Sequence, residues 1–224
     1  MAGYLDAIFV PLSLLLMVGY HVYLCYCLKK YPSNTIIGVN SYQQRVLLSD
    51  IMKDGERKSM LAVQTIRNTQ MASIFNASVA ILVNTALAAL SNNSYKASHL
   101  HNHALLGSKS YEIVAIKYAS TSFILLSSFF CSSSALALFM DANYSITAFS
   151  FDHDSTSFTF PKVILERGNL LALIGNRLLW LSFPLLLWML GPLPLIFSSA
   201  AMIWWLYDLD FLRYINIVRK KCHK

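Results

Sequence analysis

Charged side chains are scarce in this sequence of 224 residues, since only 13% are Asp, Glu, Lys or Arg. Soluble domains carry about 25% charged residues, and a disordered chain would lack the 56% hydrophobic share found here. Cysteine is also scarce, with four residues and no C-x-x-C pair, which excludes a disulfide framework and gives no sign of a zinc finger. The composition therefore predicts an integral membrane protein.

Enzyme signatures are missing as well. The sequence contains no H-E-x-x-H, G-x-S-x-G, P-loop or G-x-G-x-x-G motif, and its histidines do not form the spaced boxes of a di-iron membrane enzyme. We therefore predict no enzyme, no catalytic residue and no cofactor. The net charge of +7 comes without a stacking platform or a reading helix, so nucleic acid is not an expected partner.

Four long segments are nearly free of charge, and each is long enough for one crossing of a bilayer. About 20 apolar residues in a helix cross a hydrocarbon core of about 30 Å, and lipid cannot satisfy the open backbone groups of a strand. We expect helices at 7–28, 69–90, 114–139 and 179–207. The predicted fold class is an all-α integral membrane bundle of four transmembrane helices in one domain, 1–224, with a basic tail at 208–224.

The last segment, 179–207, allows two arrangements. It contains Pro184 and the run Gly191-Pro192-Leu193-Pro194, which would kink one helix or turn a re-entrant hairpin. Trp180 lies near one end and Trp204 near the other, as in an aromatic belt that brackets a single crossing. We therefore favour one helix kinked by its proline and glycine residues.

Lysine and arginine predict the orientation. The segment 29–68 carries seven of them, which places it in the cytosol by the positive-inside rule, and 91–113 then lies outside. Four crossings would leave the tail 208–224 outside, although its five Lys and Arg favour the cytosol. The side of this tail stays open at this point.

The segment 29–68 is also amphipathic and long enough for a helix of its own, which Gly55 would divide. It either lies on the membrane surface or packs on the bundle as a solvated helix. Near the expected helix ends, Arg67, Glu166, Arg167 and Arg177 form an ion-paired ring or bind lipid headgroups, and we favour the ion pairs.

Several motifs resemble a known family. These are Gln64-Thr65-Ile66-Arg67-Asn68, Arg167-Gly168-Asn169, the segment 182–188 and Gly191-Pro192-Leu193-Pro194. Together they resemble the plant membrane proteins of the DUF599 family, a domain of unknown function, over roughly 5–215. The resemblance implies a multi-pass plant membrane protein and no established activity.

Two expected helices carry a polar face. On the third helix, Lys117 shares one side with serine and other small residues, and the second helix presents asparagine and alanine in the same way. Small and polar residues commonly serve close helix packing, which we favour, but they would also line a polar pathway with Lys117 as an anion-attracting mouth. The candidate pathway residues are Asn76, Asn84, Lys117, Ser120, Ser127 and Ser134.

Histidine clusters are the only hint of a metal. His99, His101 and His103 alternate in a predicted loop, where three imidazoles could hold zinc or copper. No second shell accompanies them, and the stretch Asp152-His153-Asp154 has the character of a solvated turn. We therefore predict no metal site, and leave open whether the three histidines bind metal.

Two function classes remain. The first is a membrane interaction or scaffold component, and the alternative is a channel or transporter component for a small anion or neutral solute. Expected partners are membrane lipids, and either partner membrane proteins or further copies of the chain. The expected location is the plasma membrane or an endomembrane, and the sequence names neither a ligand nor the membrane.

Overall fold

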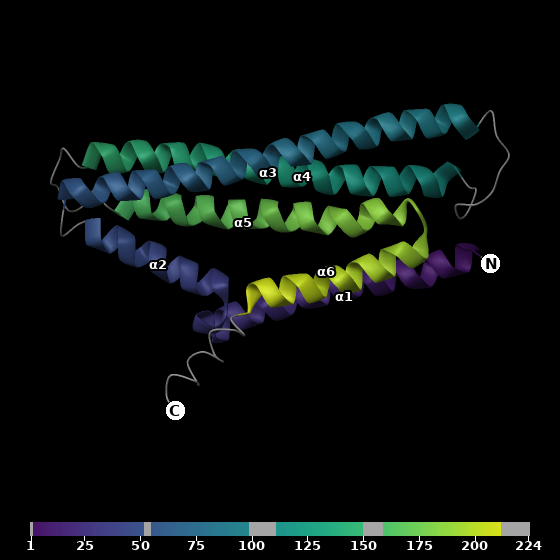
Figure 1. Cartoon of the computed structure of the whole chain (residues 1–224), viewed down its shortest axis with the longest axis horizontal. Helices are drawn as coiled ribbons and strands as arrows, with labels where there is room; N and C mark the ends of the chain where they lie inside the picture. Colours follow the sequence, from purple (N-terminus) through teal and green to yellow (C-terminus); the bar gives the residue numbers. More distant parts are fainter. Residues whose placement is uncertain (1, 52–54, 99–110, 150–158, 212–224) are drawn as a thin grey trace.

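The computed structural model describes residues 2–51, 55–98, 111–149 and 159–211 (Figure 1). Its elements are α1 (Ala2–Lys30), the short 3-10 helix η1 (Pro32–Asn34), α2 (Ile36–Ile51), α3 (Gly55–Ser98), α4 (Tyr111–Phe149), α5 (Thr159–Trp188) and α6 (Pro192–Asp210). Four stretches are long and apolar enough to cross a membrane: Ile8–Lys30, Met60–Asn92, Val114–Thr147 and Phe160–Trp188. The prediction of an all-α membrane bundle is confirmed.

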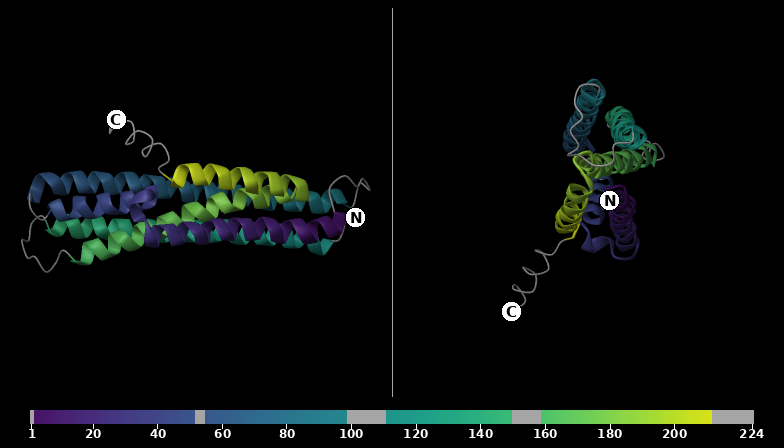
Figure 2. Two further views of the ribbon diagram at one scale, coloured as in Figure 1. Left: turned by 90° about the horizontal axis from the view of Figure 1, so that it is seen from below. Right: turned by 90° about the vertical axis from the view of Figure 1, so that its right-hand side faces the viewer.

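The helices form two groups that run side by side. The long helices α3, α4 and α5 are antiparallel neighbours in one group, while α1 and α6 pair in the other (Figure 1). Viewed from one end, α5 lies between the α3–α4 pair and the α1–α6 pair (Figure 2). The helix α2 leans from the end of α1 towards the first turns of α3 and so bridges the two groups.

Two helices, α3 and α4, are much longer than the sequence predicted. The 44 residues of α3 make a helix of about 66 Å at 1.5 Å per residue, against a hydrocarbon core of about 30 Å. The segments 29–68 and 140–178, expected as connections, are largely helical in the described residues. Buried apolar side chains join this part of the three-helix group: Ala62, Ile66, Ala135, Phe139, Ala142, Ile146 and Leu165.

The segment 179–207 is two helices and not one kinked helix, which corrects the predicted last span. Residues Met189 to Gly191 form a turn, and Gly191 has a φ of 145° that only glycine adopts without strain. The helix α5 begins at Thr159, and two of its charged residues, Glu166 and Arg177, form ion pairs with Arg45 and Asp210. Pro192 then opens α6 at a position where its missing N–H costs nothing.

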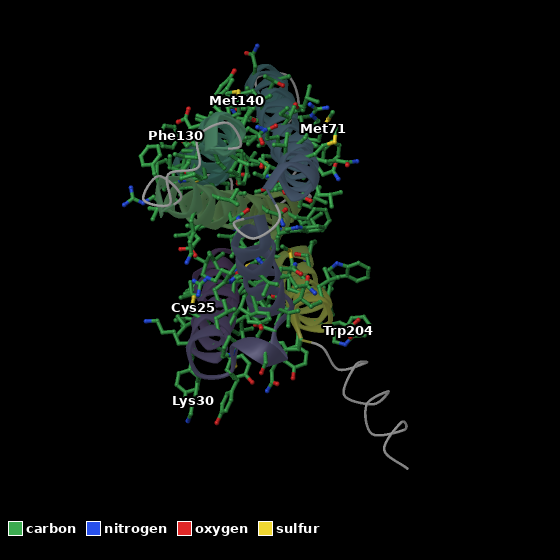
Figure 3. The ribbon with its side chains drawn as sticks, turned by 90° about the vertical axis from the view of Figure 1, so that its left-hand side faces the viewer. Cys25, Lys30, Met71, Phe130, Met140 and Trp204 are labelled. Carbon is green, nitrogen blue, oxygen red and sulfur yellow. The ribbon has the colours of Figure 1, made fainter. Side chains whose placement is uncertain are left out.

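Large apolar side chains cover the outside of the bundle. Met71, Phe130 and Trp204 are 64%, 71% and 74% exposed, and they point away from the helix contacts (Figure 3). A soluble monomer rarely exposes so many large apolar groups. This surface suits lipid, in agreement with the composition.

Candidate functional site

The two asparagines of the candidate pathway lie where α3 packs on α4. The Asn76 amide donates to the Ser132 hydroxyl over 2.6 Å, and both side chains are buried. The Asn84 carbonyl oxygen accepts from the Ser122 hydroxyl over 2.7 Å. Each asparagine thus bonds to a serine outside the predicted set, and both bonds tie one helix to the next.

Lys117 lies in the second turn of α4 and is only 6% exposed. Its Nζ donates to the Trp188 carbonyl over 3.4 Å and stands 5.1 Å from the centre of the Trp188 ring. The same carbonyl accepts from the Gly191 N–H over 3.1 Å. Because a helix C-terminus is negative and leaves its last carbonyls open, Lys117 stabilises the end of α5.

Two of the three remaining pathway serines donate their hydrogen bonds within α4. Ser120 donates to the Lys117 carbonyl over 3.0 Å and Ser127 to the Phe123 carbonyl over 2.8 Å, both within α4. Ser134 is half-buried. The structure does not bring these three hydroxyls to Asn76, so the predicted residues do not meet as one group.

A tight contact between α4 and α5 lies beside them. The Ser128 hydroxyl donates to the Gly175 carbonyl over 2.7 Å. A Cβ on Gly175 would stand 2.5 Å from the Ser132 hydroxyl oxygen, so only glycine allows this approach. Ser128, Ser132 and Gly175 therefore form a packing site that the sequence analysis did not single out.

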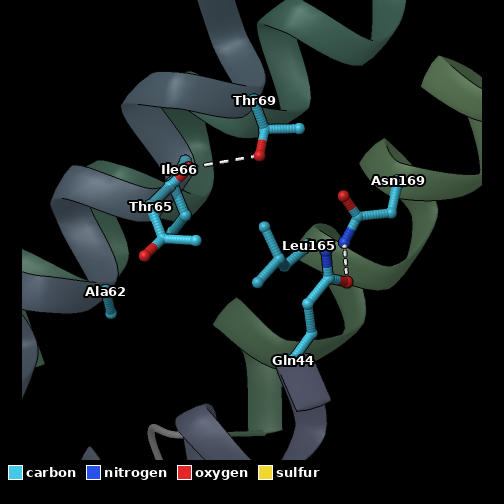
Figure 4. A pocket seen from close by; sticks show the side chains of 7 residues that line it. All are labelled: Gln44, Ala62, Thr65, Ile66, Thr69, Leu165 and Asn169. Atoms are coloured by element: carbon cyan, nitrogen blue, oxygen red, sulfur yellow. Dashed lines mark hydrogen bonds between the residues drawn. The ribbon is translucent and has the colours of Figure 1, made fainter. Parts of the chain in front are cut away.

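Two polar pairs hold α2 against α5. Arg45 Nε donates to Glu166 Oε1 over 3.0 Å, with both side chains well exposed. The Asn169 amide donates to Gln44 over 2.6 Å and closes one side of a small cavity of about 20 Å³ (Figure 4). These two pairs join α2 to the bundle.

A larger groove lies beside this contact. It has a volume of about 720 Å³ and is bounded by Leu28 of α1 and by residues of α2, α3 and α5. We call it the α2 groove. Along α5 its lining runs from Leu165 to Trp180, which is about 22 Å of helix at 1.5 Å per residue.

A buried ion pair joins the two helix groups. Arg177 of α5 makes a two-fold contact with the carboxylate of Asp210 at the end of α6, and the Tyr20 hydroxyl of α1 donates to that carboxylate over 2.5 Å. The Arg177 and Asp210 side chains are 16% and 3% exposed. Three helices, α1, α5 and α6, therefore meet on one carboxylate.

The model of a family described as protein of unknown function, DUF599, matches residues 8–214. This chain belongs to the DUF599 family. The resemblance to the DUF599 family drawn from the sequence motifs is thus confirmed. No curated protein and no solved structure matches the DUF599 chain.

The metal hypothesis concerns residues that lie outside the described part of this DUF599 chain. His99, His101 and His103 belong to them, as does the stretch 152–154. Within the described residues, no three His, Cys, Asp or Glu side chains are grouped to hold a metal ion.

Sequence analysis named Glu166 and Arg177 as ion-pair candidates in the DUF599 chain but missed their partners. Arg45 lies 121 residues from Glu166, and Asp210 lies 33 residues from Arg177. The second partner had a signal: a hairpin turning at Gly191 would have brought Asp210 back towards Arg177. The partner of Glu166, Arg45, had no such signal in the sequence, since no local pattern relates α2 to α5.

Proposed function

We propose that the protein is a membrane interaction component that docks other membrane proteins, or further copies of itself, through the projecting ends of α3, α4 and α5. The observation that carries this proposal is the three-helix extension with its own buried core of Ala62, Ile66, Phe139 and Leu165. Such an extension is a rigid platform that a helical bundle does not need merely to cross a bilayer.

The surface of this extension supports the proposal. Met60, Tyr144 and Phe160 are 75%, 75% and 65% exposed, and they come from three different helices. These residues lie at the outer ends of the candidate spans, of which Met60–Asn92 and Val114–Thr147 are longer than a core of about 30 Å requires, and exposed apolar side chains on helix ends that project from the membrane are typical of protein contacts. The polar residues Asn76, Asn84 and Lys117 meanwhile serve contacts within the bundle.

We further infer that α6 crosses the membrane as a fifth span. Its 19 residues make about 28 Å of helix, close to the core thickness of about 30 Å. It lies along α1, where Tyr23 contacts Phe211 at the end that carries Lys29 and Lys30. Five crossings put the basic tail on the same side as the basic segment 29–68, as the positive-inside rule requires.

The docking proposal is tested by the size of the protein after mild solubilisation of native membranes. We expect the wild type to run on a native gel in an assembly clearly larger than the 25.2 kDa chain. Tyr144→Ser and Phe160→Ser should shift it towards the single chain, while the conservative control Tyr144→Phe should not. A wild type that runs as a single chain, or two serine variants that leave the assembly intact, would refute the proposal.

Transport of a small anion or neutral solute is the second candidate. The observation in its favour is the α2 groove, whose lining includes Asn76 and Asn176 within the α3 and α5 spans and which is only partly enclosed. Purified protein in liposomes is assayed for ion flux with a potential-sensitive dye across several salts. Flux by the wild type supports transport, whereas flux that is unchanged in Lys117→Met refutes the role of Lys117 as a mouth.

A further inference from the structure

The α2 groove changes from polar to apolar along its length. At the α2 end it is lined by polar side chains, among them Asn40, Ser41 and Arg45 of α2 and Glu166 of α5. Further along, no lining residue is charged, and apolar groups, including Phe75, Leu170, Leu173, Leu179 and Trp180, outnumber polar ones such as Asn76 and Asn176. A ligand that fits must therefore be amphipathic, with a polar head at α2 and an apolar body along α5.

The dimensions agree with one layer of lipid. The lining between Glu166 and Trp180 covers 14 residues of α5, or about 21 Å. One leaflet contributes about half of a hydrocarbon core of about 30 Å, which leaves room at the polar end for a headgroup. The groove is also only partly enclosed, so part of the ligand can remain outside it.

The polar end carries one charge of each sign. Arg45 and Glu166 form a pair through a single Nε bond of 3.0 Å, and their side chains are 62% and 42% exposed. The guanidinium has five N–H donors, so one such bond leaves it able to bind a phosphate as well. The carboxylate of Glu166 is placed beside it to accept a cation.

We propose that the α2 groove binds one zwitterionic phospholipid from the surrounding leaflet, with its phosphate at Arg45, its ammonium group at Glu166 and one acyl chain between α3 and α5 towards Trp180. Asn40 and Ser41 supply further donors to the phosphate. The second acyl chain stays in the bilayer outside the groove. This assignment is independent of the docking role proposed above.

The zwitterionic headgroup is favoured over an anionic one by the charges. An anionic headgroup would satisfy Arg45 but would place a further negative charge next to Glu166. A headgroup with both signs replaces the exposed Arg45–Glu166 pair with two pairs of opposite charge. A protein helix could fill the apolar part of the groove. Its backbone groups bond within the helix, so they would not bind Arg45 and Glu166 at the polar end.

The experiment counts lipids that stay bound to the purified full chain. The protein is reconstituted in nanodiscs of phosphatidylcholine, phosphatidylethanolamine and phosphatidylglycerol in equal amounts, released into mild detergent and weighed by native mass spectrometry. We expect one retained lipid per chain, with phosphatidylcholine or phosphatidylethanolamine exceeding phosphatidylglycerol. No retained lipid, or a preference for phosphatidylglycerol, would overturn the proposal.

Four variants locate the bound lipid. Arg45→Gln should lower retention at least about tenfold, which is the effect of losing one hydrogen bond to a charged group. Glu166→Gln should shift the retained lipid towards phosphatidylglycerol. This change in lipid preference can be measured even if Arg45→Gln loosens α2. Ala72→Phe fills the groove and should abolish retention, whereas the exposed Ala89→Phe on the same helix should not. Equal retention in Ala72→Phe and Ala89→Phe would place the lipid elsewhere and refute the assignment.

Discussion

Removing the Asp210 carboxylate should destabilise the protein more than any other single loss of a polar contact. The carboxylate is 3% exposed and accepts hydrogen bonds from Arg177 and Tyr20. In Asp210→Ala, the Arg177 guanidinium would stay buried with no opposite charge. Breaking a buried pair in this way costs about 3–5 kcal/mol, because the remaining charge is not compensated.

Two further variants separate the terms of this cost. Tyr20→Phe removes one hydrogen bond to a charged acceptor and should cost about 1.5 kcal/mol. The double variant Arg177→Met with Asp210→Ala removes both charges, so no uncompensated ion remains in the low-dielectric interior. It should therefore be more stable than Asp210→Ala alone, although it lacks one more native side chain.

The free energies are measured by unfolding the purified protein in mixed micelles with increasing SDS, followed by circular dichroism. We expect the free energy of unfolding to fall from the wild type to Tyr20→Phe and then to Asp210→Ala. The double variant should have a higher free energy of unfolding than Asp210→Ala. An Asp210→Ala protein as stable as the wild type would show that the carboxylate does not hold Arg177. A double variant less stable than the single one would show that shape, and not charge, determines the cost.

Three other outcomes follow from the helix contacts. Gly175→Ala places a Cβ 2.5 Å from the Ser132 hydroxyl oxygen and should lower the melting temperature, whereas the control Gly19→Ala meets nothing within 4 Å and should leave it unchanged or raise it. Gly191→Ala puts a side chain at a φ of 145° and should cost about 1–3 kcal/mol, seen in the same SDS titration. A protease-cleavable tag added after the last residue should be cut only from the side that also exposes the segment 29–68; cleavage from the other side would contradict five crossings.

The sequence predicted where apolar helices run but not where they end. The nearly charge-free segments 7–28 and 114–139 lie within α1 and α4, since a crossing requires about 20 apolar residues. Their ends were set at the first charged residue, yet α4 continues to Phe149. Charges on the outside of a three-helix extension are hydrated, so they give no reason for a helix to stop.

The candidate site was predicted in part, for a related reason. Helical periodicity placed Asn76 and Asn84 on one side of α3, and both do bond to α4. It could not select Ser132 and Ser122 as their partners, because a serine can also donate to a carbonyl of its own helix. Ser127 does so, and its polarity therefore carries no information about which side faces a neighbour.

The conflict over the side of the basic tail 208–224 comes from the assumption that helices begin and end at charged residues, here applied to α5. If a helix must begin where charges end, the segment after Arg177 holds only one crossing, and the five basic residues of 208–224 fall on the wrong side. Arg177 instead lies inside α5, because Asp210 of α6 neutralises it. The ion pair that lets α5 start earlier is thus also the contact that requires α6 to turn back along α1. If α6 is a fifth span as proposed, the same buried pair lies inside the hairpin of α5 and α6 that would return the chain to the side of the segment 29–68, so the side of the tail and the stability of Asp210→Ala test the same feature of the fold.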